Sequence, residues 1–108
     1  MYGSIMRVRL KKGQRDAFHR LMEARVHVHA PRGLHSIEMG WEDKDPDRVV
    51  AIIHFTDKDS YVKNAQAPET DKDYREMLQY MEGEPEWIDL HYTSYSGKPL
   101  AGEMSARQ

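Results

Sequence analysis

Histidine is the first residue type to consider for chemistry in this sequence, because imidazole can both hold a metal and move a proton near neutral pH. The segment "VHVHA" (Val26–Ala30) places His27 and His29 two residues apart. In a strand these side chains would share a face and could chelate a metal together, whereas in a helix they point to nearly opposite sides. The preceding residues have helical spacing, and no third ligand follows at a recognisable distance. We therefore expect the end of a helix here, where imidazolium suits the helix dipole, and no bound metal.

His35 is the sequence's candidate for a general base. It belongs to the alternating segment "LHSIEMGWE", in which His35, Ile37, Met39 and Trp41 share one side. A neutral imidazole beside a substrate can remove a proton at physiological pH. The alternative is a partly hydrated histidine at the end of a strand, with no part in catalysis.

The elements that carry these residues follow from the periodicity of the apolar side chains. Alternation predicts strands over residues 2–10, 34–42, 48–55 and 86–95, with turn formers at 43–47. Helical spacing predicts helices over residues 14–28, over a short segment with Tyr61, Val62 and Ala65, and over a segment with Tyr74, Met77, Leu78 and Met81. Thr70 and Asp73 resemble a capping box before the last helix, and Pro68 separates it from the helix before.

This order of elements predicts one α+β domain with helices on one face of a mostly antiparallel sheet. The run Val49–Ile53 is apolar at consecutive positions, so both faces of its strand need to be buried. Since the helices can cover only one face, we expect a second copy of the sheet on the other face. The resulting homodimer would be closed and two-fold, through Val50, Ile52 and His54. His54 would then be an interface histidine.

Length and composition narrow the class of protein. A chain of 108 residues fits one domain and would gain stability from further burial in an oligomer. Charges of both signs are interleaved, the net charge is −2, and no basic block is present, so we expect no nucleic-acid partner. No apolar stretch approaches the ~20 residues that span a bilayer, and the N-terminal segment lacks the pattern of a secretion signal, so we expect no membrane partner. The absence of cysteine is compatible with the cytoplasmic location that we expect.

Four segments together resemble the antibiotic biosynthesis monooxygenase-like family. They are "MYGSIMRVRLKKGQRDAF", "APRGLHSIEM", "DPDRVVAIIHFTDKDSYVKN" and "EPEWIDLHY", and they span Met1 to about Tyr95. The resemblance implies a ferredoxin-like subunit whose sheet packs on that of a second subunit, which forms a dimeric α+β barrel. It places one domain over residues 1–96 and leaves 97–108 as a flexible C-terminal tail.

The resemblance also implies a cofactor-independent monooxygenase, an oxidoreductase that acts on a small aromatic such as a phenol or quinol. Its cavity would lie between sheet and helices. The family's tyrosine and arginine correspond to Tyr61 and Arg75, which could stabilise a phenolate or enolate. The family's asparagine and tryptophan positions hold Ala51 and Phe55 here. With His35 as the base that removes the substrate proton, the expected catalytic set is His35, Tyr61 and Arg75.

The remaining expectations concern binding, cofactors and alternatives. The residues expected to bind the aromatic substrate are Met6, Met39, Trp41, Ala51, Phe55 and Asn64. Relatives that degrade haem use a histidine from the later helices, and no histidine stands between Asp57 and Met81, so we expect no cofactor. Two alternatives remain open on the same scaffold: a non-catalytic small-molecule-binding or vestigial dimeric module, and another reaction such as isomerisation or decarboxylation with His35 as base.

Overall fold

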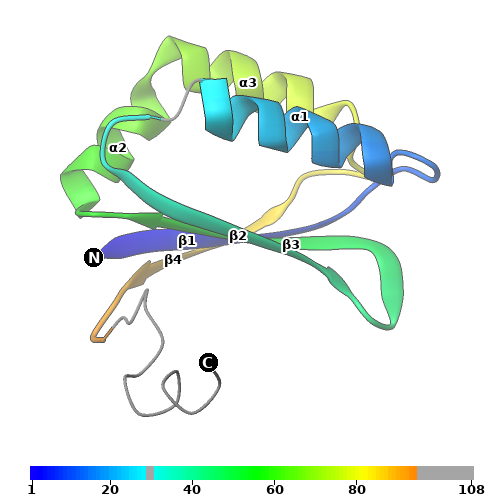
Figure 1. Ribbon diagram of the computed structural model, residues 1–108, viewed down its shortest axis with the longest axis horizontal. Coiled ribbons are helices and arrows are strands. Elements are labelled where there is room, and N and C mark those ends of the chain that lie inside the picture. The colour runs from blue at the N-terminus through cyan, green and yellow to red at the C-terminus, as the bar shows by residue number, and fades with distance from the viewer. Residues whose placement is uncertain (29–30, 95–108) are drawn as a thin grey trace, which may run out of the picture.

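The computed structural model describes the backbone of residues 1–28 and 31–94, and the side chains of residues 1–25 and 31–94. In chain order the elements are β1 (Tyr2–Arg9), α1 (Arg15–Val28), β2 (Leu34–Glu42), β3 (Asp45–Phe55), α2 (Lys58–Gln66), α3 (Pro68–Leu78) and β4 (Glu86–His91). All three helices lie on the same face of the sheet (Figure 1). The predicted α+β, ferredoxin-like architecture is thereby confirmed for the single chain.

The four strands form one antiparallel sheet in the order β2-β3-β1-β4. The central strand β1 pairs with β3 on one side and β4 on the other. In this register Met6 lies opposite Ala51 and Trp87. Because directly paired residues point to the same face, this row of side chains points toward the helices.

The core lies between the sheet and the helices. Phe18 of α1 is fully buried against sheet residues, and partly buried residues of β2 pack around the same cluster. Its buried members are Met6, Val8, Leu10, Phe18, Val49, Ala51, Met77 and Met81. Met6, Ala51 and Phe55, which were expected to line a cavity between sheet and helices, are all buried on the helix-facing side of the sheet.

The strand β2 departs from strict alternation at its start. Leu34 pairs with Phe55, but the next pair is Ser36 with His54, so the register shifts between Leu34 and Ser36. An extra residue in one strand is a β-bulge, and it reverses the face of every residue before it. His35 is that residue. The expected alignment of His35 with the helix-facing side chains is therefore wrong.

The start of α3 also differs from the expectation. The helix begins at Pro68, directly after the N-cap Ala67, and no side chain caps it. Proline suits a first helical position, because its missing N–H would have no intrahelical partner there. The Thr70 hydroxyl donates instead to Asn64 Oδ1 at 2.9 Å. The predicted capping box of Thr70 with Asp73 is therefore wrong, whereas Asp57 does cap α2, accepting from the Ser60 amide at 2.7 Å.

Among the residues that the structure describes, none of the helices lies over the second face of the sheet (Figure 1). Its apolar side chains come from three neighbouring strands, and Ile88 is 52% exposed. This apolar patch consists of Ile5, Val50, Ile52, Ile88 and Leu90. His54 also points to this face, is buried beside β2, and lies with Nε2 3.0 Å from Glu38 Oε1.

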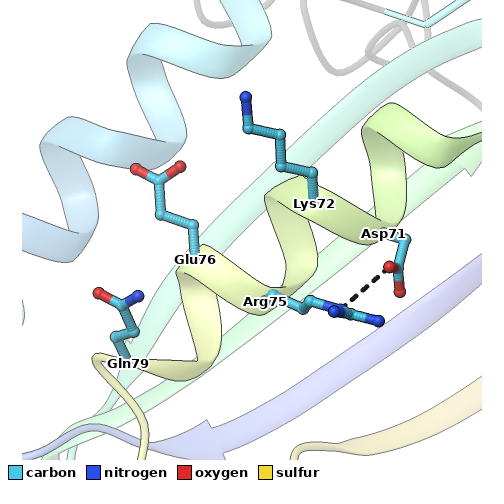
Figure 2. Close-up of a pocket in the computed structure, with 5 residues that line it drawn as sticks. All are labelled: Asp71, Lys72, Arg75, Glu76 and Gln79. Atoms are coloured by element: carbon cyan, nitrogen blue, oxygen red, sulfur yellow. Dashed lines mark ion pairs between the residues drawn. The ribbon is translucent and has the colours of Figure 1, made fainter.

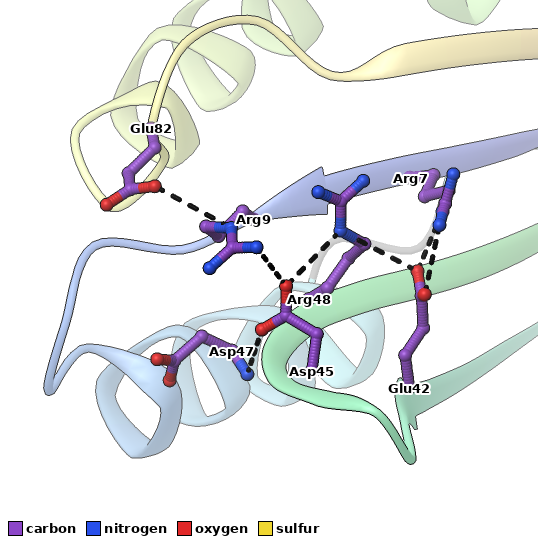
Figure 3. A network of polar contacts seen from close by, with 7 residues as sticks. All are labelled: Arg7, Arg9, Glu42, Asp45, Asp47, Arg48 and Glu82. Carbon is purple, nitrogen blue, oxygen red and sulfur yellow. Dashed lines mark hydrogen bonds and ion pairs between the residues drawn. The ribbon is translucent and has the colours of Figure 1, made fainter.

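One end of the same face is charged rather than apolar. Figure 3 shows alternating arginines and carboxylates gathered where the β2–β3 hairpin turns beside β1. Arg7 holds Glu42 through two hydrogen bonds of 2.7 and 3.0 Å, and Arg48 lies 3.6 Å from Asp45. Arg9 also pairs with Asp45. The network neutralises three arginines that would otherwise repel each other across β1 and β3.

Two expectations fall partly or wholly outside the described residues. The helix α1 runs to Val28, so His27 has the expected helical backbone, but the side chains of residues 26–30 lie outside the described part. The expected tail, 97–108, lies outside it entirely. Among the described residues, no helix is long and apolar enough to cross a membrane.

Candidate functional site

A cleft of about 1420 Å³ lies between the sheet and the helices. All four strands and all three helices contribute to its lining. The apolar part of the wall is formed by Met6, Met22, Leu34, Ile37, Ile53, Phe55, Met77 and Trp87. Its volume exceeds the roughly 300–1,000 Å³ that is usual for a small-molecule pocket, and beside the apolar wall the lining carries many polar and charged side chains.

Three polar side chains, Ser4, Tyr61 and Asp89, form a cluster at the wall of the cleft, which Tyr61 and Asp89 line; we call it the Asp89 cluster. Ser4 and Asp89 are directly paired on β1 and β4 and face the helices. The Ser4 hydroxyl donates to Asp89 Oδ1 at 2.7 Å, and the Tyr61 hydroxyl donates to the same oxygen at 3.1 Å. Ser4 is fully buried. Two hydroxyl groups thus hold one carboxylate in place at the wall of the cleft.

Two aromatic rings pack against the ring of Tyr61. Its ring centroid lies 5.1 Å from that of Tyr2 and 5.5 Å from that of Phe55. Tyr2 in turn contacts His91 edge-on at 4.8 Å. Such tilted and edge-on contacts are the favoured arrangements of aromatic pairs. They fix the ring of Tyr61 independently of its hydrogen bond.

The electrostatics of Tyr61 follow from this setting. Burial raises the pKa of Tyr61 above its usual range, because a phenolate loses hydration in the cleft. A hydrogen bond with Ser4 acts in the opposite direction, while the hydrogen bond and the negative charge of Asp89 raise the pKa further. At neutral pH Tyr61 therefore keeps its proton and acts as a hydrogen-bond donor.

Arg25 of α1 is a charged residue at the helical side of the cleft. Its side chain is only 17% exposed and lines the cleft. The guanidinium pairs with Asp73 and, at 2.6 Å, with Glu76, both on α3. This arrangement links two helices and balances the positive charge, so it supports the roof of the cleft.

The structure brings together only part of the predicted site. Of the residues expected to bind substrate, Met6, Phe55 and Asn64 line the cleft, as does Tyr61. Ala51 is fully buried in the core under the helices, and Met39 and Trp41 pack against that core. The Trp41 ring is covered by the Arg15 guanidinium, 4.4 Å from its centroid.

Arg75 lies on the outer side of α3 and not in the cleft. Figure 2 shows it beside a shallow depression of about 540 Å³ that is lined by Asp71, Lys72, Arg75, Glu76 and Gln79. Its side chain is 76% exposed and pairs with Asp71 at 3.0 Å, one helical turn away. This geometry is that of a solvated surface pair. The expected convergence of Arg75 with Tyr61 on one cavity is not found.

His35 is also separate from the cleft. It is exposed, it is not among the lining residues, and its Nδ1 lies 3.1 Å from the Ser36 hydroxyl. The bulge at the start of β2 is the reason, because it places Leu34 in the cleft wall in the position where alternation predicted His35.

Sequence reasoning missed Ser4, Asp89 and Arg25. Ser4 and Arg25 each stand on an otherwise apolar face, Ser4 in line with Met6 and Val8 and Arg25 on the apolar stripe of α1. A polar residue on a core-facing stripe is the signal that would have found them. Among the described residues, no three histidine, aspartate or glutamate side chains are grouped as a metal site would require.

Comparison with known proteins identifies the family. The antibiotic biosynthesis monooxygenase family model matches residues 1–77. A protein assigned as an antibiotic biosynthesis monooxygenase from Chloroflexus aurantiacus is 20% identical, with a TM-score of 0.72, and the match covers 89% of this chain and 96% of that one. A variant of SnoaB, a cofactor-independent oxygenase from Streptomyces nogalater, is 13% identical, with a TM-score of 0.74 and coverage of 90% and 97%.

Rv0793 from Mycobacterium tuberculosis is similar to a comparable degree, at 12% identity, a TM-score of 0.73 and coverage of 89% and 98%. No curated protein matches the sequence significantly. Identities this low establish a shared fold and not a shared substrate. The family model covers well over half of the sequence, and the chain belongs to the antibiotic biosynthesis monooxygenase family.

Proposed function

We propose that the cleft binds a small phenol or quinol and that the protein is a cofactor-independent monooxygenase. The observation that carries the proposal is Tyr61, whose ring packs on two other aromatic rings and whose hydroxyl donates to Asp89 at the wall of the cleft. Family membership supports the reaction class, and the similar fold of SnoaB, a cofactor-independent oxygenase, supports it further.

The proposed reaction converts a phenol to a quinone with dioxygen as the oxidant. The phenolic O–H is ionised, and the resulting electron-rich anion passes an electron to dioxygen. A ring C–H is then replaced by a C=O bond. The substrate loses four electrons, one oxygen atom enters the quinone, and the other leaves as water. The protein's part is to orient the ring against aromatic side chains and to supply the Tyr61 hydroxyl, which would turn from Asp89 to the ligand and donate to the developing oxyanion.

One observation favours the alternative of a non-catalytic binding module. Of the three residues expected to act together, His35 and Arg75 lie outside the cleft, and only Tyr61 lines it. A cleft with one such donor is sufficient for binding a flat aromatic molecule, and it supplies less stabilisation to a reacting anion.

Oxygen consumption with a dihydroxyanthrone as substrate separates the two functions. We expect the protein to consume oxygen and to form the quinone, measured by electrode and by absorbance. Tyr61→Phe should lower turnover by about tenfold or more, because it removes one donor to the oxyanion. Tyr80→Phe is the control, since Tyr80 packs on Phe18 away from the cleft. Tight binding without oxygen consumption would instead establish the binding module.

A homodimer through the open sheet face forms part of the same proposal. The apolar patch around Ile52 supports it, because a sheet face of this character is stabilised by burial against a second copy. The Arg7–Glu42 network would border that interface. Ile52→Asp should give monomeric or insoluble protein by light scattering, whereas Lys12→Asp, on an exposed turn, should remain dimeric. A folded, dimeric Ile52→Asp protein would refute this interface.

A further inference from the structure

The Asp89 cluster has a feature that the proposed oxygenase role of Tyr61 does not use. Both hydroxyl donors, from Ser4 and Tyr61, bind the same carboxylate oxygen, Oδ1. In the described part of the chain no hydrogen bond to the second oxygen, Oδ2, is found. Asp89 lines the cleft and retains exposed surface. A carboxylate that is oriented through one oxygen can accept a hydrogen bond from a ligand at the other.

The buried partner of Asp89 makes this arrangement rigid. Ser4 is fully buried, and its hydroxyl also lies 3.3 Å from the carbonyl oxygen of Ile88, the residue before Asp89 on β4. The direct pairing of Ser4 with Asp89 across β1 and β4 places the two side chains together through the sheet itself. Groups held by regular strands are positioned more precisely than groups on loops.

The basic side chains that line the cleft are not paired with Asp89. Arg25 is already paired with Asp73 and Glu76, and Arg75 lies on the outer surface of α3. The other basic residues of the lining, Arg32, Lys63 and Lys72, are exposed. Charges in contact with water are strongly screened. The charged groups beside the aromatic rings are the Asp89 carboxylate, which accepts from Tyr61, and the exposed Lys58 ammonium, 5.8 Å from the centroid of the Tyr2 ring.

We infer that Asp89 accepts the hydroxyl proton of the aromatic ligand in a hydrogen bond, so that the cleft selects neutral phenols over their ethers and over aromatic anions. This inference rests on the proposed aromatic-binding function and gives it a substrate class. A phenol donates one hydrogen bond to Asp89, an ether has no proton to donate, and a carboxylate ligand is repelled by the like charge.

The same contact provides a path for the proton in the proposed reaction. When the phenol ionises, its O–H bond breaks and an O–H bond forms at Asp89, while the electron pair stays on the phenolic oxygen. Asp89 then occupies the role of proton acceptor that the sequence assigned to His35. Ser4 is a positioning residue, because it holds Asp89 and is buried beneath it.

Three matched naphthalenes test the inference without any need for turnover: naphthol, methoxynaphthalene and naphthoate. Binding is measured by calorimetry and by quenching of tryptophan fluorescence, since Trp87 lines the cleft. We expect the unmodified protein to prefer naphthol over each of the other two by about tenfold or more, the usual effect of one charge-assisted hydrogen bond. Asp89→Asn should abolish the preference over methoxynaphthalene and improve naphthoate binding, because the amide carries no charge and can donate.

Two further variants keep the test clear. Ser4→Ala should reduce the preference for naphthol without reversing it, since the carboxylate remains but is held less firmly. Glu23→Gln is the control for the loss of one negative charge, because Glu23 is exposed on α1, pairs only with His19 among the described residues, and is not in the cleft. Its ligand preferences should equal those of the unmodified protein.

The outcomes separate the inference from the proposed function. If the unmodified protein binds all three naphthalenes equally, the aromatic cleft stands and the role of Asp89 is overturned. The same holds if Asp89→Asn, folded by circular dichroism, keeps the original preference. If the unmodified protein binds none of them, the aromatic-binding function is overturned and the inference with it.

Discussion

The hydrogen bond between Tyr61 and Asp89 can be tested on its own, because the ring of Tyr61 is held independently of its hydroxyl. Tyr61→Phe keeps the ring contacts with Tyr2 and Phe55 and removes only the O–H that donates to Asp89 at 3.1 Å. Hydrogen bonds to charged groups contribute about 1.5–3 kcal/mol, but exposure of Asp89 to solvent weakens this one. We expect Tyr61→Phe to lower the free energy of unfolding by about 1 kcal/mol.

A double-mutant cycle with Asp89→Ala isolates the pair. If the hydroxyl of Tyr61 stabilises the fold through its hydrogen bond to Asp89, the double variant should lose about 1 kcal/mol less free energy of unfolding than the sum of the two single variants. Unfolding by urea, followed by circular dichroism, provides the free energies. The protein concentration must be the same in all samples, because assembly into a homodimer would make stability depend on it. The control cycle replaces Tyr61→Phe by Tyr80→Phe, which should be additive with Asp89→Ala because Tyr80 contacts Phe18 instead.

The cycle has a result that refutes the reasoning. A coupling free energy below about 0.3 kcal/mol for Tyr61 with Asp89 would show that the hydrogen bond adds nothing to stability beyond solvation. An equal coupling for Tyr80 would show that Asp89→Ala perturbs the fold as a whole. In either case the Asp89 cluster could not be treated as a defined structural unit.

Two further predictions concern pH and the rim of the cleft. Burial raises the pKa of Tyr61 above its ordinary value of 10.0, so the folded state holds the phenolic proton more tightly than the unfolded chain. The resulting stabilisation should be complete below about pH 10 and lost as pH rises through the folded-state pKa, and urea unfolding of Tyr61→Phe should show a smaller alkaline loss. Gly33 has φ +85°, and an added Cβ would meet the side chain of Ser60, so Gly33→Ala should cost about 2 kcal/mol or more. Gly13→Ala, also at positive φ (+80°) but in open space, should lose less, and equal thermal shifts would contradict the contact with Ser60.

The local sequence was sufficient for the architecture. Alternating and helical spacings predicted the order of strands and helices. Tyr74, Met77 and Leu78 of the expected stripe are at least partly buried on α3, whereas Met81 is buried beyond the end of that helix, in a bridge with Leu10. The two periodicities follow from the local geometry of helices and strands, so they can be recognised in each segment without knowledge of the rest of the chain. The resemblance to the family rested on the same ordered segments, and the match over residues 1–77 confirms it.

The position of Arg75 shows where local reasoning reached its limit for a helix. Placing Arg75 by its correspondence in the family put it in the cavity, but it follows directly after Tyr74, which lines the cleft. Four successive residues of α3, Asp71 to Tyr74, line the cleft, so spacing along the helix alone does not exclude Arg75. The rotation of the helix was decided by packing, and it leaves the Arg75 side chain 76% exposed and paired with Asp71.

The candidate site itself depended on tertiary structure. The sequence was sufficient to place four residues of the cleft wall, Met6, Phe55, Tyr61 and Asn64, because strand alternation and the family's order of elements predict their positions. His35 was displaced by a bulge, and a bulge of one residue reverses a strand's parity without leaving a clear mark in composition. Ser4 and Asp89 are separated by 85 positions in the chain and meet only because β4 pairs with β1. The sequence by itself determined which elements form, and the pairing of distant strands decided which polar groups share the cleft, since that pairing depends on the burial of the whole sheet rather than on any one segment.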